Sequence, residues 1–237
     1  MQIKIIFNNT AISGRFLTGW GFSCIIDESI LFDAGESEKS LFENMKNMSI
    51  DIGKIEEVVI SHDHWDHTGG LWELLKRRKG LKVYACPNFS VGFKEKVNNS
   101  GGILIEKDTF FEISKDIFVT GEIAGLYKGQ HMAEQALVVK TNAGITLITG
   151  CAHPGIIKMA ENVKKEFPED KIYLVLGGFH LKNQSKGDTE LVAYNLCQLG
   201  IKKLAPTHCT GESAIEIFKE KCGEDFIEAK TGQIIDV

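Results

Sequence analysis

The sequence predicts a layered α/β fold, and three observations support this prediction. Short apolar runs alternate with amphipathic stretches along all 237 residues, a pattern typical of helices packed on sheets. Hydrophobic residues make up 43% and charged residues 25% of the chain, a balance that favours a globular protein over a disordered one. No Pro-rich or Ser-rich linker interrupts the pattern, so we expect a single domain over residues 1–237.

In the first half of the chain, apolar runs predict strands and amphipathic stretches predict helices. The expected order is strands at residues 1–7, 22–26 and 29–32, a helix at 38–47, a strand at 57–60, a helix at 71–76 and a strand at 82–85. Residues 86–135 are less regular: strands are expected near 103–105 and 117–120, and residues 121–135 are expected to form a loop. The strand at 57–60 leads into a strand-to-helix loop, where α/β enzymes usually place their chemistry.

The second half has a plainer rhythm. Residues 136–140 and 145–149 predict a hairpin, because Asn142-Ala143-Gly144 supplies turn residues between β-branched flanks. The elements expected after it are a helix at 155–167, a strand at 172–176, a helix at 188–198, a strand at 203–205, a helix at 212–221 and a final short strand.

Composition and charge argue against a nucleic-acid-binding, membrane-spanning or exported protein. The net charge of −5 disfavours nucleic acid, which binds proteins that offer a basic surface. No tract is apolar enough to span a bilayer, and the short apolar N-terminus lacks the pattern of an export signal. The six cysteines contain no CxxC pair, so reduced thiols in the cytoplasm are expected. The oligomeric state cannot be read from the sequence.

The most informative stretch is Ser61-His62-Asp63-His64-Trp65-Asp66-His67. Three imidazoles and two carboxylates this close together are costly to bury without partners, and a metal ion would supply one. Imidazole nitrogen and carboxylate oxygen suit Zn²⁺, with Mn²⁺ and Fe²⁺ as competitors. We expect His62 and His64 to face one ion and Asp66 and His67 to serve a second. Gly69-Gly70 follows at a helix start, where the amides either hold an anion or only allow the turn.

This HxHxDH pattern resembles the defining motif of the metallo-β-lactamase superfamily, and Phe32-Asp33-Ala34-Gly35 looks like the first Asp motif of that superfamily. The resemblance implies a four-layer αββα sandwich with the metals at one edge of the facing sheets. Asp33 would then orient a ligand or the His loop without touching metal.

Three later histidines follow predicted strands and are candidates for the same site. His153 and His208 each stand between an apolar strand and a helix, so we expect both to be metal ligands. His180 also follows a strand, and here a metal ligand, a proton donor and a substrate contact are all considered; we favour the last two. The expected metal set is therefore His62, His64, Asp66, His67, His153 and His208.

The chain departs from the commonest superfamily pattern after the predicted hairpin. Many members carry there an Asp that bridges two metals, whereas this chain has Cys151 at about that position. Cys151 is either a thiolate ligand or a small buried residue. Glu134 is another candidate oxygen ligand, because it precedes the hairpin where many relatives carry a histidine. The missing bridge leaves open whether one or two ions bind.

The later motifs are similar to a narrower branch of the superfamily. Gly-Cys-Ala-His-Pro-Gly at 150–155, Gly-Gly-Phe-His-Leu at 177–181 and Pro-Thr-His-Cys-Thr-Gly at 206–211 resemble metal-dependent hydrolases grouped with the dihydropterin-methyl-ribofuranosylaminobenzene-phosphate synthase. The synthase role would join a pterin methyl diphosphate to an arylamine ribofuranosyl phosphate, and we rank it below hydrolysis because it depends on likeness alone.

The expected activity is hydrolysis of a small ester, lactone or phosphoester by metal-bound hydroxide, since divalent ions lower the pKa of bound water to about 7. Asp66 would hold the attacking water and shuttle its proton, and His180 would protonate the leaving group. The substrate is expected to be a small molecule, and phosphorylated or pterin-like compounds are among the candidates. The rivals are an iron-dependent oxidoreductase and a non-catalytic metal-binding module.

Overall fold

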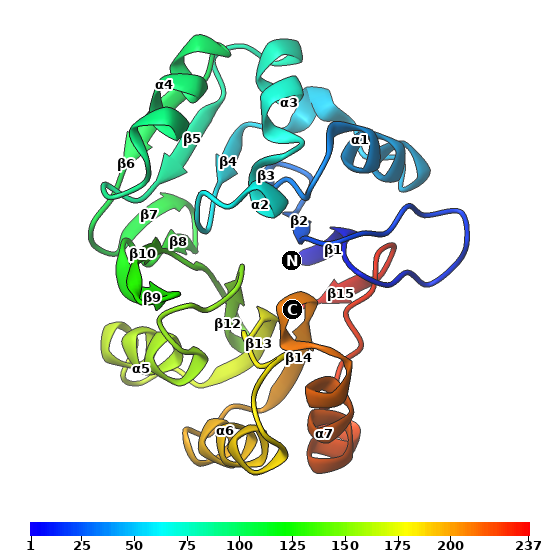
Figure 1. The fold of residues 1–237 in the computed structure, drawn as a ribbon, viewed down its shortest axis with the longest axis vertical. Helices are drawn as coiled ribbons and strands as arrows, with labels where there is room; N and C mark the ends of the chain where they lie inside the picture. The colour runs from blue at the N-terminus through cyan, green and yellow to red at the C-terminus, as the bar shows by residue number, and fades with distance from the viewer. The chain divides into compact units, whose positions relative to one another are not determined.

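The protein is described by a computed structural model that covers residues 1–237 and has a mixed α/β fold. Its internal contacts divide it into two compact units. The first unit comprises Met1–Asp108 with Lys230–Asp236, and the second comprises Thr109–Ala229 with Val237. Each unit contains a sheet flanked by helices (Figure 1), which confirms the predicted α/β class. The expectation of one domain over residues 1–237 stays a prediction.

The first unit is built on a seven-stranded sheet. In spatial order its strands are β15 (Ile234–Asp236), β1 (Gln2–Phe7), β2 (Ser23–Ile26), β3 (Ile30–Phe32), β4 (Glu57–Val59), β5 (Lys82–Ala85) and β6 (Ile103–Glu106). Neighbours from β15 to β3 are antiparallel, whereas those from β3 to β6 are parallel. Parallel strands end at the same edge of a sheet, so the residues that follow β3 and β4 lie together.

Helices flank this sheet and form the connections between its strands. They are α1 (Glu38–Asn47), the short α2 (Trp65–Thr68), α3 (Leu71–Arg77), α4 (Val91–Asn99) and the 3-10 turn η1 (Ile52–Lys54). α1 begins where the Ser37 hydroxyl accepts a hydrogen bond from the Ser40 amide, and such caps satisfy donors that a helix start leaves open. α2 carries Asp66 and His67, so the predicted motif spans the loop after β4 and α2 itself.

The second unit has a six-stranded sheet and a separate two-stranded one. The larger sheet has the order β14 (Lys203–Thr207), β13 (Ile172–Gly178), β12 (Gly144–Thr149), β11 (Leu137–Thr141), β8 (Ile117–Val119) and β7 (Phe111–Ser114). β12, β13 and β14 are parallel. The smaller sheet pairs β9 (Ile123–Tyr127) with β10 (Gln130–Glu134).

The core of the second unit forms between the large sheet and three helices, α5 (Ile156–Glu166), α6 (Lys186–Gln198) and α7 (Glu212–Cys222). α5 buries Ile156, Met159, Ala160 and Val163, a spacing that places all four on one helical face. Full burial of an isoleucine, methionine or valine side chain contributes about 1.5–3 kcal/mol from the hydrophobic effect. The 3-10 turns η2 (His208–Thr210) and η3 (Gly223–Asp225) lie on either side of α7. None of the helices combines the length and apolarity that crossing a bilayer requires.

Residues 86–135 differ most from the expectation. The structure adds α4 and β7, and the predicted loop at 121–135 is wrong, because these residues form the β9–β10 hairpin. Its turn has φ of 51° at Lys128 and 78° at Gly129, the left-handed conformation of a tight hairpin turn. Lysine is uncommon in that conformation, so the sequence lacks the Asn-Gly or Asp-Gly signal that would have indicated the hairpin.

Candidate functional site

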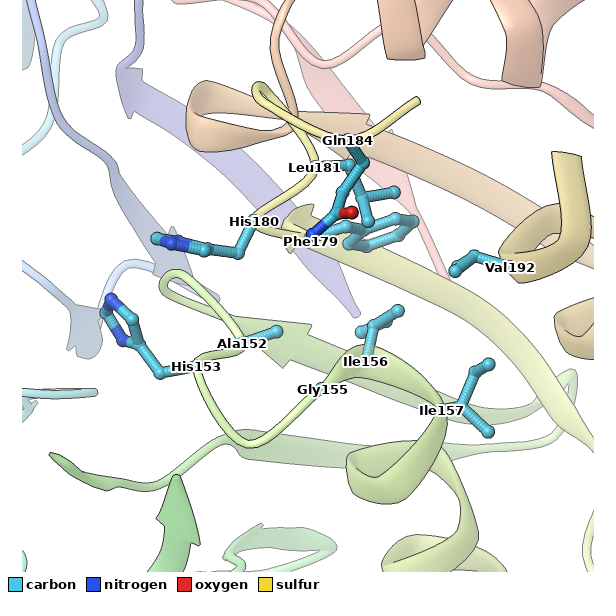
Figure 2. A pocket seen from close by; sticks show the side chains of 10 residues that line it. All are labelled: Ala152, His153, Gly155, Ile156, Ile157, Phe179, His180, Leu181, Gln184 and Val192. Atoms are coloured by element: carbon cyan, nitrogen blue, oxygen red, sulfur yellow. The ribbon is translucent and has the colours of Figure 1, made fainter. Parts of the chain in front are cut away.

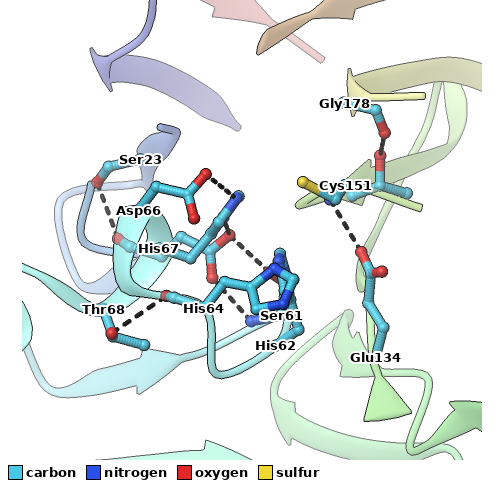
Figure 3. A network of polar contacts seen from close by, with 12 residues as sticks. Ser23, Ser61, His62, His64, Asp66, His67, Thr68, Glu134, Cys151 and Gly178 are labelled. Carbon is cyan, nitrogen blue, oxygen red and sulfur yellow. Dashed lines mark hydrogen bonds and ion pairs between the residues drawn. The ribbon is translucent and has the colours of Figure 1, made fainter. Parts of the chain in front are cut away.

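Three histidine rings gather in the first unit, on the loop after β4 and on α2 (Figure 3). The ring centroid of His62 lies 4.7 Å from that of His64 and 4.2 Å from that of His67. His62 and His67 are fully buried, and Asp66 is 5% exposed. Asp66 Oδ2 lies 3.5 Å from His67 Nε2. The predicted residues of this motif are thus brought together within the first unit.

Asp33 forms a hydrogen bond with the His67 ring. It directly follows β3, where its amide donates to the Val59 carbonyl at 2.9 Å. Its buried Oδ2 accepts from His67 Nδ1 at 2.6 Å, and the Ser61 amide and hydroxyl donate to the same carboxylate at 2.7 Å each. Burial raises the pKa of Asp33, against the lowering by His67 and Ser61. Because Nδ1 of His67 donates, Nε2 is the acceptor of that ring and has the form that binds a metal.

Ser61 extends the same network to His62, a role that the sequence reasoning missed. Its hydroxyl donates to Asp33, and it lies 2.9 Å from His62 Nδ1. A hydroxyl has one hydrogen, so His62 Nδ1 is the donor to Ser61 and Nε2 is the acceptor of the His62 ring. The signal available in the sequence was a hydroxyl residue beside a histidine at a strand end. Two rings are therefore fixed in the same tautomer through one buried carboxylate.

Gly69 and Gly70 serve the packing of the loop. Their amides donate to the carbonyls of Gly35 at 2.8 Å and Ala34 at 3.2 Å, so the turn interpretation is favoured over anion binding. A Cβ atom at Gly69 would lie 2.0 Å from the Glu36 carbonyl oxygen. Only glycine permits this approach of the two backbones.

The second unit places its candidates at the carboxyl ends of three parallel strands. Cys151 and His153 follow β12, His180 follows β13, and His208 opens η2 after β14. Three residues of these strand ends have left-handed backbones although they are not glycine: φ is 58° at Ala152, 54° at His180 and 51° at His208. Such conformations cost free energy and are held only where the surrounding structure enforces them, often at functional sites.

Glu134, at the end of β10, organises the His153 loop. Its buried carboxylate accepts from the Cys151 amide at 2.9 Å (Figure 3). It also accepts from the amides of Ala152 and His153 at 2.7 Å each and from His153 Nδ1 at 2.8 Å. Burial opposes the charged form, but these hydrogen bonds outweigh it and keep the pKa of Glu134 below its ordinary value. Both oxygens are engaged, so the structure places Glu134 behind His153, in the way that Asp33 stands behind His67.

His180 stacks at an angle on His153, with ring centroids 4.6 Å apart. Tyr127 lies near both rings, at 5.1 Å from His153 and 6.0 Å from His180. A hydrogen bond with Cys209 raises the pKa of His180, against the effect of burial. Cys209 is buried, and sequence reasoning did not select it. The signal was its position next to His208.

A cavity of about 240 Å³ opens beside His153 and His180 (Figure 2). Its walls are mainly apolar and come from the first turn of α5, the loop after β13, and α6; the lining includes Ile156, Phe179, Leu181 and Val192. Gln184 adds one amide group to this lining. Such a pocket suits an apolar group with few polar contacts.

The donors present fit a divalent metal. Within the second unit, the donor atoms of Cys151, His153 and His180 all lie within 4.8 Å of one another, as do those of Cys151, His208 and Cys209. In the first unit, His62 and His67 present Nε2 as the acceptor nitrogen. Imidazole, carboxylate and thiol donors are the ligand types that zinc takes in proteins. Asp33 and Glu134 supply the hydrogen-bond partners that metal-binding histidines usually have.

Comparison with known protein families matches residues 25–188 to the metallo-beta-lactamase superfamily. A relative named 7,8-dihydropterin-6-methyl-4-(beta-D-ribofuranosyl)-aminobenzene-5'-phosphate synthase, from Methanocaldococcus jannaschii, is 31% identical; the match covers 89% of this chain and 85% of the relative. An uncharacterized protein of the same organism is 30% identical, with full coverage of both chains.

Solved structures agree with these matches. A metal-dependent hydrolase of the β-lactamase superfamily superposes with a TM-score of 0.83 and 29% identity, over 100% of this chain and 99% of the other. The metallo-beta-lactamase fold protein YhfI from Bacillus subtilis superposes with a TM-score of 0.68 over 99% of each chain. At 15% identity the second likeness concerns the fold alone.

Proposed function

Because this chain belongs to the metallo-beta-lactamase superfamily, we propose that it is a metal-dependent hydrolase of a small ester, lactone or phosphoester. The observation that carries the proposal is the network of Asp33, Ser61, His62 and His67, which sets Nε2 as the acceptor in two buried rings. Histidines that bind metal usually donate their other ring nitrogen to a carboxylate or hydroxyl in this way, which fixes the tautomer and the ring orientation.

The proposed metal ligands are those expected from the sequence: His62, His64, Asp66, His67, His153 and His208. We propose one or two zinc ions, with manganese or iron as the alternatives. When bound, such ions lower the pKa of coordinated water and polarise a carbonyl or phosphoryl oxygen of the substrate. Asp33 and Glu134 are proposed as positioning residues, because their carboxylates are filled by hydrogen bonds from His67 and from the His153 loop.

Two side chains are proposed to handle protons. Asp66 would orient the attacking water and accept its proton, since its carboxylate lies beside His67 in the motif. His180 would protonate the leaving group. The raised pKa of His180 supports this role, because it increases the protonated fraction near neutral pH. The cavity beside His180 and His153 would then receive part of the substrate.

A second candidate function is the synthase reaction, in which an arylamine replaces the diphosphate of a pterin methyl diphosphate. The name of the 31% identical relative favours this alternative. The mainly apolar walls of the 240 Å³ cavity would suit a flat ring of either reactant. Both candidates imply a small-molecule substrate. No disulfide joins any of the six cysteines, which suits the proposed cytoplasmic location.

The experiment that tests these proposals uses purified protein loaded separately with zinc, manganese or iron. Hydrolysis is measured on phosphodiesters, lactones and thioesters, and coupling is measured with a pterin methyl diphosphate and an arylamine ribofuranosyl phosphate. Turnover that disappears in His64→Ala and Asp66→Asn protein supports the metal-dependent enzyme, and the reactive substrate decides between the two candidates.

The rival functions give different results in the same experiment. Redox activity confined to the iron-loaded protein would favour an oxidoreductase. Inactivity on every substrate with every metal, in protein that binds metal fully, would favour a non-catalytic binding module.

A further inference from the structure

Two buried thiols, those of Cys151 and Cys209, lie close together beside β13 in the six-stranded sheet of the second unit. Cys151 follows β12 and Cys209 follows β14, and β13 lies between these two strands. The residue of β13 beneath the thiols is Gly178. A Cβ atom there would lie 2.6 Å from Cys209 Sγ and 3.2 Å from Cys151 Cα. The absence of a side chain at Gly178 is therefore what lets cysteines from two non-adjacent strands come together.

The surroundings of the two thiols include several side chains that could bind a metal ion. The donor atoms of Cys151, Cys209 and His208 lie within 4.8 Å of one another. Cys151 also belongs to a second such group, with His153 and His180. Cys209 Sγ lies 3.5 Å from the Cys151 carbonyl oxygen. Both groups contain Cys151, so its sulfur is common to the two sets of possible metal donors in the second unit.

The other cysteines have no such surroundings. Cys24 and Cys86 are buried as well, Cys197 is exposed and Cys222 is partly buried, yet none of the four belongs to a cluster of possible metal donors. Burial of a small apolar side chain explains Cys24 and Cys86. It does not explain why both thiols that flank Gly178 face imidazoles.

We infer that Cys151 and Cys209 bind a divalent ion as thiolates and make its site selective for thiophilic cations. Zn²⁺, Fe²⁺ and Co²⁺ would be preferred over Mg²⁺, Ca²⁺ and Mn²⁺, because thiolate sulfur is a soft ligand whereas the latter three ions prefer oxygen. Each thiol releases its proton to solvent when its sulfur binds the cation, so no oxidant or reductant is needed. The inference rests on the proposed metal dependence and is independent of the reaction catalysed.

The test uses the full chain loaded with Co²⁺ under reducing conditions, after titration shows that the thiols are free. We expect a sulfur-to-cobalt charge-transfer absorption in the near ultraviolet. The band should become weaker in Cys151→Ser and in Cys209→Ser protein and disappear in the double variant. Cys197→Ser is the matched control, because Cys197 is an exposed cysteine of α6, and it should keep the full band. Circular dichroism checks folding, and Cys→Ala variants replace any serine variant that does not fold.

Metal affinity gives a second readout. In the double variant, Zn²⁺ affinity should fall by more than about tenfold, the lower bound seen when a group that merely supports a ligand is lost. Mn²⁺ affinity should stay close to that of the unaltered protein. A cobalt-loaded protein without the band, or a band that persists in the double variant, overturns the inference.

These results are distinguishable from a failure of the proposed function. Bound cobalt and turnover without the sulfur band would leave the hydrolase proposal standing and remove only the thiolate ligands. Unchanged metal stoichiometry in His64→Ala plus His67→Ala protein would instead remove the proposed metal site of the first unit, whatever the spectrum of the cysteines.

Discussion

At the scale of single residues, Asp33 and Glu134 perform matching tasks. Each is a fully buried carboxylate that accepts the Nδ1 hydrogen of one histidine. Asp33 also accepts the Ser61 amide, and Glu134 accepts three amides of the loop that carries His153. A carboxylate placed in this way sets both the tautomer and the orientation of the ring. The chemistry proposed for the histidines thus depends on two residues that touch no substrate.

Asp33→Asn is expected to weaken zinc binding by about 10–100-fold, the usual effect of losing a partner behind a metal ligand. The amide cannot accept all three hydrogen bonds now made by His67 and Ser61. The measurement is a competitive zinc titration. Asp63→Asn is the control, since Asp63 lies in the same loop and accepts only from the Ser90 amide at 2.8 Å. Equal affinities for the two variants would contradict the role given to Asp33.

Glu134→Gln is expected to lower the free energy of unfolding of the metal-free protein by about 2 kcal/mol, because a buried charged acceptor with several donors is lost. Urea unfolding measures this change. Glu161→Gln, an exposed substitution on α5, should leave the midpoint unchanged. A Glu134→Gln midpoint equal to that of Glu161→Gln would show that the four hydrogen bonds contribute little.

At the scale of elements, the close spacing of β12, β13 and β14 depends on glycine in the middle strand. Gly178→Ala would place a Cβ 2.4 Å from the Gly150 carbonyl oxygen and 2.6 Å from Cys209 Sγ. We expect a loss of about 1–3 kcal/mol in unfolding free energy, the usual cost of overpacking. Gly187→Ala in α6 has 3.9 Å to the nearest atom and should stabilise by about 0.4–1 kcal/mol. Thermal unfolding measures both variants. A higher thermal midpoint for Gly178→Ala than for Gly187→Ala would contradict this account.

A hydrogen bond between side chains of β4 and β5 should make the stability of the fold depend on pH in the alkaline range. Burial, followed by the charge of Glu57 and the hydrogen bond to it, raises the pKa of Tyr84 from 10.0 to about 12. The Tyr84 hydroxyl donates to Glu57 Oε1 at 3.2 Å. Between these pH values the unfolded chain loses the phenol proton while the folded chain keeps it, so stability should fall as the pH rises from 10 to 12. Tyr84→Phe should flatten this decline in urea unfolding. An equally steep decline would assign it to other groups.

The elements themselves were predicted unevenly, for a physical reason. α5 and the β11–β12 hairpin match the expectation closely, because a 3.6-residue apolar period and an Asn-Ala-Gly turn are local signals. The β9–β10 hairpin was missed, since Lys128 adopts φ of 51° in its turn without a turn-forming residue type. Conformations imposed by tertiary packing leave no local signal of this kind.

At the scale of the whole molecule, metal binding should raise the stability of the fold. A ligand that binds only the folded protein stabilises it by about 2.7 kcal/mol at 100 times its dissociation constant. We expect a chelator to lower the thermal midpoint and added zinc to restore it. His131→Ala, at an exposed position of β10, should keep the full shift, and His64→Ala plus His67→Ala should reduce it. A midpoint indifferent to the chelator would contradict metal binding.

The sequence by itself determined the fold class, the family resemblance and the candidate donors, because apolar period and motif spacing are local properties of the chain. Apart from Asp33, which the family resemblance indicated, only the tertiary structure decided which groups form hydrogen bonds with those donors. Ser61 joins Asp33 to His62, Glu134 holds His153, and Cys209 reaches Cys151 across Gly178. These contacts join residues far apart in the chain, and they follow from strand order and register, which arise when the sheets form and which no short stretch of sequence encodes.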